Sequence, residues 1–222
     1  MINTLDDYIC HSMPQWGDFT TNPSLRKKVD ESGNLLPFLG NTVVFLLDDD
    51  TKEKLRQLQE SLYRAAPKML AQPLQMSTFH MTLHDLANGA PEQPELQDYI
   101  HYTQARVSQI LPSWKDTPPL RMKTTRLFNM VNTSIVLGLK PADEESWRRL
   151  EEMYTALEDV VRLGYALTPH ITMAYFLPGT YTQEQVQRLS SVLRNVDMEI
   201  SLDMKNLVFQ EFSDMNHYKT VL

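Results

Sequence analysis

Two short segments of the chain share a pattern that suits acid–base chemistry. Residues 80–83 read His-Met-Thr-Leu, and residues 170–173 read His-Ile-Thr-Met. Side chains alternate between the two faces of a β-strand, so the histidine and threonine of each segment point the same way while the apolar residues face the core. Two such strands placed together would offer two imidazoles and two hydroxyls to one surface.

These groups suit the cleavage of a phosphodiester. His80 and His170 are the candidate catalytic residues, because one neutral imidazole can take a proton while one imidazolium gives a proton to the leaving oxygen. An ordinary histidine pKa of about 6.5 permits both roles. Thr82 and Thr172 are the candidate phosphate-binding residues, since their hydroxyls can donate hydrogen bonds to non-bridging oxygens. This chemistry needs no metal and no cofactor.

The His-x-Thr pattern is not specific by itself. His101 and Thr103 repeat it, but they lie in a segment with helical periodicity, residues 92–111, and a polar residue follows them. Helical neighbours two positions apart do not share a face. We therefore exclude His101 as a catalytic residue and keep the two histidines that have strand context.

The elements that must position the two motifs follow from hydrophobic periodicity and capping signals. Capping boxes are expected at residues 50–53 and 182–185, each opening an amphipathic helix, and further helices are expected over residues 92–111 and 143–162. The segments with strand character are residues 41–47, 74–86, 120–131, 133–139, 170–177, 200–209 and 218–222.

The order of these elements indicates a duplication. Asn-Thr begins a strand at residues 41–42 and again at residues 132–133, and a His-x-Thr strand follows 39 (80 − 41) and 38 (170 − 132) positions later. Chance similarity between two α/β halves is the alternative, because such alternation is common. A ligand cleft is expected between two related lobes.

Composition limits the partners and the chemistry. The formal net charge is −7, and no basic stripe of the kind that binds long nucleic acids is visible. Seven glycines occur without a phosphate-loop or dinucleotide-binding pattern. Cys10 is the one cysteine, so we expect no internal disulfide and no cysteine-based zinc site. We disfavour Cys10 as a catalytic thiol.

Targeting signals are not evident in the sequence. No apolar run reaches membrane-spanning length, and Asp6 and Asp7 precede any apolar stretch, unlike a signal peptide. We expect a cytoplasmic protein that does not bind membranes and that is a monomer. The expected partner is a small nucleotide or RNA-end substrate, with no extended nucleic-acid surface.

The paired His-x-Thr-x motifs, 90 positions apart (170 − 80), resemble the 2H phosphoesterase superfamily, which includes the LigT-like RNA 2′,3′-cyclic phosphodiesterases. Residues 33–42 look like an uncharacterised branch of that superfamily. The resemblance covers residues 37–222 and leaves residues 1–36 as an N-terminal extension.

The resemblance implies an α+β fold with two lobes, in which antiparallel sheets line a central cleft and helices lie outside. The lobe-like halves would span about residues 37–130 and 131–222. It also implies a metal-independent phosphodiesterase that acts on 2′,3′-cyclic phosphates or related nucleotide phosphodiesters. In the family pattern, the catalytic histidines match His80 and His170, and the hydroxyl positions match Thr82 and Thr172.

Three further residues and one rival function stay open at this point. His84 either shares the cleft face or lies at a solvent-exposed strand end, and Arg126 either neutralises a phosphate or is a surface arginine. Tyr175 alternates away from His170 and Thr172 and is expected to be a packing residue. The rival function is a non-catalytic nucleotide or RNA-end binding module that uses the same cleft.

Overall fold

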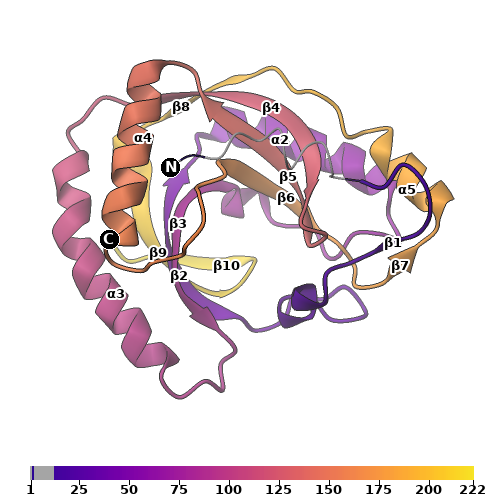
Figure 1. Ribbon diagram of the computed structural model, residues 1–222, viewed down its shortest axis with the longest axis horizontal. Helices are drawn as coiled ribbons and strands as arrows, with labels where there is room; N and C mark the ends of the chain where they lie inside the picture. The colour runs from indigo at the N-terminus through magenta and orange to yellow at the C-terminus, as the bar shows by residue number, and fades with distance from the viewer. Residues whose placement is uncertain (1, 3–12) are drawn as a thin grey trace.

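The computed structural model describes residue 2 and residues 13–222, so Cys10 lies outside the described residues. Helices surround a curled sheet of eight antiparallel strands (Figure 1). The elements in chain order are β1 (Phe19–Thr20), η1 (Pro23–Lys27), β2 (Leu39–Leu46), α2 (Asp49–Ala65), η2 (Met76–Thr78), β3 (His80–Gly89), α3 (Leu96–Ile110), η3 (Leu111–Trp114), β4 (Leu120–Met130), β5 (Ser134–Pro141), α4 (Glu144–Glu158), β6 (His170–Tyr175), β7 (Thr180–Tyr181), α5 (Gln183–Ser190), β8 (Glu199–Leu202), η4 (Met204–Asn206), β9 (Leu207–Asp214) and β10 (His217–Thr220).

The large sheet consists of two four-stranded lobes. Its strand order is β10-β9-β2-β3-β6-β5-β4-β8, so the two motif strands β3 and β6 meet in the middle. Met81 pairs with Ile171 at this junction, and both side chains are fully buried. The expected α+β, two-lobed fold with antiparallel strands is therefore confirmed.

The two lobes exchange strands. β4 pairs with β5 and β8 in the second lobe, although it precedes the second half of the sequence. In return, β9 pairs with β2 in the first lobe and with β10. The lobes of the sheet therefore do not coincide with residues 37–130 and 131–222.

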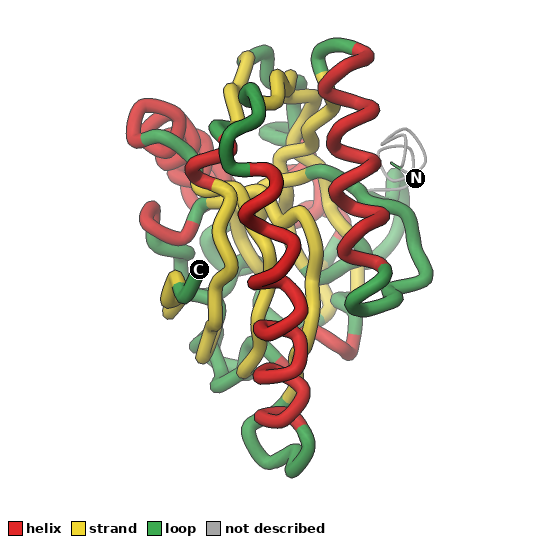
Figure 2. Tube along the Cα trace, turned by 90° about the vertical axis from the view of Figure 1, so that its left-hand side faces the viewer, coloured by secondary structure: helices red, strands yellow, loops and turns green. Residues whose placement is uncertain are grey.

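The helices lie outside the sheet and begin at recognisable caps. Asp48 caps α2 by accepting a hydrogen bond from the Thr51 backbone, so the cap lies before the expected box at residues 50–53. The expected capping box between Thr182 and Gln185 opens α5. α3 contacts β3, and α4 contacts β4 and β5. These two helices, at the left of Figure 1, lie in front of the strands in Figure 2.

Two expected strands are shorter or divided. Residues 74–79 contain the short helix η2, and β3 begins only at His80. The expected strand 200–209 is divided by η4 into β8 and β9.

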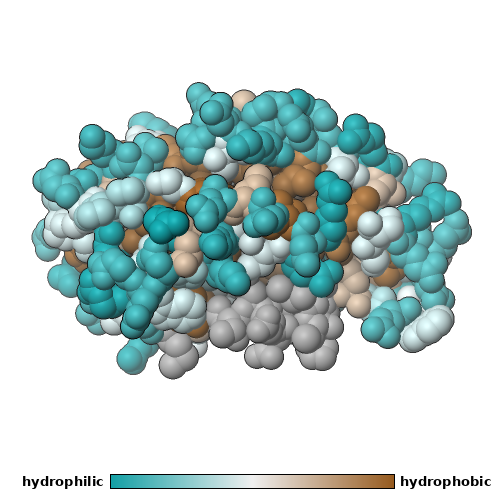
Figure 3. Space-filling model, turned by 90° about the horizontal axis from the view of Figure 1, so that it is seen from above, coloured by the Kyte–Doolittle hydropathy of each residue, from teal (hydrophilic) through white to brown (hydrophobic). Residues whose placement is uncertain are grey.

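Seen from above, hydrophilic side chains cover most of the visible surface and hydrophobic ones show in a band between them (Figure 3).

Residues 19–36 pack against the second lobe and the cleft. β1 pairs with β7, and the Phe19 ring lies 4.9 Å from the Phe176 ring, centroid to centroid. Leu25 and Val29 are buried in the same core. This packing fixes Lys28, which follows η1, at the wall of the cleft described below.

Candidate active site

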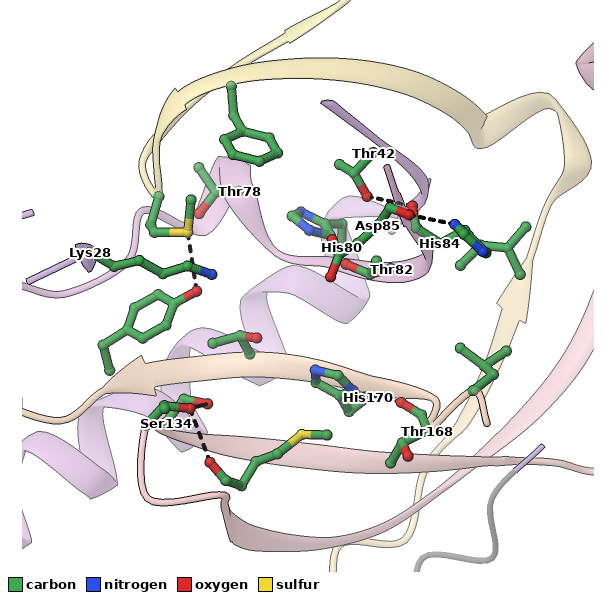
Figure 4. A pocket seen from close by; sticks show the side chains of 18 of the residues that line it. Lys28, Thr42, Thr78, His80, Thr82, His84, Asp85, Ser134, Thr168 and His170 are labelled. Atoms are coloured by element: carbon green, nitrogen blue, oxygen red, sulfur yellow. Dashed lines mark hydrogen bonds between the residues drawn. The ribbon is translucent and has the colours of Figure 1, made fainter. Parts of the chain in front are cut away.

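A cavity of about 500 Å³ lies between the lobes and is lined by all four residues of the two motifs: His80, Thr82, His170 and Thr172. This volume is typical of small-molecule sites. Figure 4 shows His80 and Thr82 on one wall and His170 on the facing wall. The antiparallel junction explains this arrangement, because both motif strands present alternate residues to the same space.

The same irregularity follows the threonine in both motif strands. In β3, His84 pairs with Val43 and Thr82 with Val44, so Leu83 between them has no partner in β2. In β6, Met173 is in the same way an extra residue without a partner in β5. A bulge of this kind moves the next residues to the other face of the sheet. It therefore turns Asp85 and Tyr175, at matched positions, into the cleft.

Each imidazole forms a hydrogen bond to the backbone of the residue two positions before it. His170 Nδ1 lies 2.6 Å from the Thr168 carbonyl oxygen, and a carbonyl can only accept, so this nitrogen donates. His80 also has a hydrogen bond to the Thr78 backbone. The Nε2 atom of His170 is thereby left as the nitrogen that can accept or release a proton in the cleft.

Burial favours the neutral imidazole at both positions. Desolvation lowers the pKa of His80 to about 4, against the opposing effects of the Thr78 backbone and the Asp85 charge. Desolvation also lowers the pKa of His170, while its hydrogen bond to Thr168 and the Asp85 charge oppose this change. Charging either ring in an empty cleft costs free energy because water is partly excluded.

The threonine hydroxyls are available for a ligand. Thr82 and Thr172 are half-buried, and in the described part of the chain neither hydroxyl has a protein hydrogen-bond partner. Two unpaired hydroxyls and two imidazoles therefore line the same cavity. Each hydroxyl can donate one hydrogen bond to a non-bridging oxygen.

Aromatic residues that the sequence pattern did not indicate complete the site. The Tyr218 ring meets the His80 ring edge-on at 5.1 Å between centroids, and burial raises the Tyr218 pKa well above its ordinary value. Tyr175 was expected to be a packing residue, and it does pack against the core. The bulge at Met173 also brings it to the cleft wall, which the sequence pattern did not indicate. Its hydroxyl donates to the Met215 sulfur at 3.2 Å.

The structure also places His84, Arg126 and the excluded His101. His84 is 1% exposed, so it is not a solvent-exposed strand end, and it belongs to the cleft wall. Its Nε2 lies 3.2 Å from a Glu158 carboxylate oxygen. Arg126 does not line the cleft and donates to the Leu193 carbonyl oxygen. His101 is exposed on α3, outside the site.

The described residues hold neither a metal-binding cluster nor a membrane-spanning helix. Within residue 2 and residues 13–222, no three His, Cys, Asp or Glu side chains gather as a metal-binding group. The helices in this part of the chain are all too short or too polar to cross a membrane.

Comparison with solved structures identifies the fold. A conserved protein of unknown function from Agrobacterium tumefaciens, ATU0111, superposes with a TM-score of 0.63 at 19% identity, over 92% of this chain and 93% of that one. Apo LigT of E. coli superposes with a TM-score of 0.54 at 12% identity, over 84% of this chain and 96% of LigT. No protein-family model matches the chain, and no curated protein sequence matches it.

The chain therefore has a LigT-like fold. At these identities the likeness extends to the fold, and the assignment of chemistry rests on the residues of the cleft.

Proposed function

We propose that this protein is a metal-independent phosphodiesterase that acts on a cyclic or nucleotide phosphodiester of the 2′,3′-cyclic phosphate type. The observation that carries the proposal is the cleft itself, in which two His-x-Thr strands place His80, Thr82, His170 and Thr172 around one space. In addition, LigT, which shares the fold, has been solved in complex with 3′-AMP, a nucleoside monophosphate.

The reaction would proceed by paired proton transfer. Water attacks phosphorus, and the neutral imidazole of one histidine takes its proton. The bond from phosphorus to one ribose oxygen breaks, and that oxygen receives a proton from the imidazolium of the other histidine. The product is a nucleoside monophosphate, and the two histidines have exchanged protonation states. Each such transfer contributes roughly 10²–10⁴-fold in rate.

The hydroxyls of Thr82 and Thr172 would hold the phosphoryl group during this step. They donate hydrogen bonds to the non-bridging oxygens, whose charge rises in the transition state. Donors that are already in place stabilise this charge without rearrangement. No step requires a metal.

Substrate binding would supply the charged histidine. Both imidazoles favour the neutral form in the free protein, so the general acid must be charged when the phosphodiester arrives. An anion within a few ångströms favours the imidazolium and raises its pKa. Histidines with lowered pKa values also fit a non-catalytic nucleotide or RNA-end binding module. That module is the second candidate function.

Turnover separates the two candidates. We would incubate the protein with 2′,3′-cyclic AMP, GMP, CMP and UMP in the presence of a chelator and follow the products by chromatography. Conversion of any of them to a 2′- or 3′-monophosphate supports the enzyme. Tight binding of the cyclic nucleotides without conversion, with or without added divalent metal, would leave the binding module as the function.

A further inference from the structure

The cleft has a charge at each end, and the two charges have opposite signs. Among the described residues that line it, Lys28 is the one lysine or arginine and Asp85 the one carboxylate. Figure 4 shows Lys28 at one end and Asp85 near the other, with His80 and His170 between them. The phosphoryl position of the proposed reaction therefore lies between a cation and an anion.

The Lys28 ammonium has no carboxylate partner in the described part of the chain. Instead, its Nζ lies 4.9 Å from the centroid of the Phe38 ring and 5.7 Å from that of the Tyr175 ring. Two aromatic faces fix the ammonium without neutralising it, and such contacts are weaker than a paired carboxylate in a buried site. The charge is thus held in place and remains available to an anion.

The two charged residues act on the histidines in opposite directions. The Asp85 carboxylate raises the pKa of both His80 and His170, whereas the Lys28 ammonium lowers that of His170. Both charges are therefore close enough to the reacting position to influence what binds there. Asp85 would repel a second anion at its end, and Lys28 would attract one.

We propose that the substrate carries a second anionic group, such as a terminal phosphate, which binds Lys28 while the phosphodiester lies between His80 and His170. The hydroxyl- or amine-bearing part of the substrate then points toward Asp85, whose carboxylate accepts hydrogen bonds. This inference rests on the proposed phosphodiesterase function for the identity of the first group. It makes Lys28 a specificity-determining residue, supplied by the segment that precedes β2.

Two pairs of ligands test the inference, one by binding and one by turnover. For binding, calorimetry compares adenosine 3′,5′-bisphosphate with 3′-AMP. For turnover, kinetics compare 2′,3′-cyclic AMP with and without a 5′-phosphate. The wild type should prefer the ligand with the additional phosphate in each pair, by about tenfold for one charge-assisted contact.

Three variants test whether Lys28 causes the preference for the additional phosphate. Lys28→Met keeps an unbranched apolar side chain between Phe38 and Tyr175. It should lower the affinity for the bisphosphate about tenfold more than the affinity for 3′-AMP, and so abolish the preference. Lys28→Arg keeps the charge and should retain most of the preference. Lys27→Met is the matched control, because Lys27 is exposed and does not line the cleft.

The outcomes separate this inference from the proposed function. Equal affinity of the wild type for 3′-AMP and the bisphosphate, or equal losses of both in Lys28→Met, overturns the inference even if the cyclic nucleotides are hydrolysed. A bisphosphate preference that depends on Lys28 supports it even if no cyclic nucleotide is hydrolysed. Thermal unfolding of each variant verifies that the fold is intact.

Discussion

Met81 pairs with Ile171 where the two lobes join, and each follows directly after a candidate catalytic histidine. Antiparallel pairing at this point places the residues on either side across from one another, so that His80 faces Thr172 and His170 faces Thr82. Each imidazole is thus matched with the hydroxyl of the other lobe. The buried pair beneath the cleft sets the spacing of the polar groups above it.

Shortening Ile171 should therefore affect both stability and catalysis. Ile171→Ala is expected to lower the free energy of unfolding by about 2–5 kcal/mol, and Ile171→Val by about 0.5–1.5 kcal/mol. Urea denaturation measures both. Ile200→Ala, at a buried position of the edge strand β8, is the control: a similar loss of stability should leave more activity. Equal activity in the two alanine variants would contradict this role for the junction.

Removing either histidine should nearly abolish turnover. His80→Asn and His170→Asn are each expected to lower kcat by at least about 10²-fold, the lower bound for one proton transfer. The double variant should be little worse than either single one, because the pair acts as a unit. His101→Asn, on exposed helix α3, should retain full activity. A double variant whose loss of kcat equals the product of the two single losses would argue against paired catalysis.

Each threonine hydroxyl should contribute to transition-state stabilisation. Thr82→Val and Thr172→Val keep the shape of the side chain, and each is expected to cost on the order of 10²-fold in kcat. Steady-state kinetics on the best cyclic nucleotide measures this cost. Thr155→Val, at an exposed position of α4 outside the cleft, should leave kcat unchanged. If both cleft variants keep wild-type kinetics, the two threonines stabilise their strands and do not contribute to catalysis.

The pH dependence should reflect the lowered histidine pKa values. One imidazole must be neutral and the other charged, so kcat/KM should follow a bell. With the pKa of His80 near 4 and that of His170 also lowered, its maximum should fall below about pH 6.5, the ordinary histidine value. The profile of kcat should lie at higher pH, because bound substrate favours the imidazolium. An optimum of kcat/KM above pH 7 would contradict the burial argument.

The two charged residues of the cleft should move this bell in opposite directions. Asp85→Asn removes a charge that raises both histidine pKa values, so the bell should shift to lower pH. Lys28→Met removes a charge that lowers the His170 pKa, so one limb should shift to higher pH. A series of kcat/KM measurements at constant ionic strength detects both shifts, and movement in the same direction would refute the assignment.

Periodicity and capping signals predicted most strands of the large sheet and its helices, and strand alternation predicted that each motif's histidine and threonine share a face. They did not predict β1, β7 or the division of residues 200–209 by η4. Nor could they predict the bulges at Leu83 and Met173, which depend on the pairing partner. Strict alternation consequently assigned Tyr175 to packing and missed its place in the cleft wall.

Other features had no local signature. The Asn-Thr repeat does not superpose in the structure: Thr42 pairs with Asp85, and the matched partner of Tyr175 is Ser134, so the two copies are offset by one residue. Lys28 reaches the cleft from a polar segment that has no hydrophobic periodicity. Its contribution depends on long-range packing through β1 and Phe19, which no local pattern encodes.

The exchange of strands between the lobes has a consequence for how the chain acquires its structure. Val43 of β2 pairs with Phe209 of β9, 166 positions later (209 − 43). Until that late segment has been synthesised, one edge of the first lobe has no partner, and closing so long a loop slows folding. A polypeptide cut between β4 and β5 would give two fragments, each lacking a strand of its own sheet. During biosynthesis the cleft should therefore be completed only after β9 has been synthesised and has paired with β2.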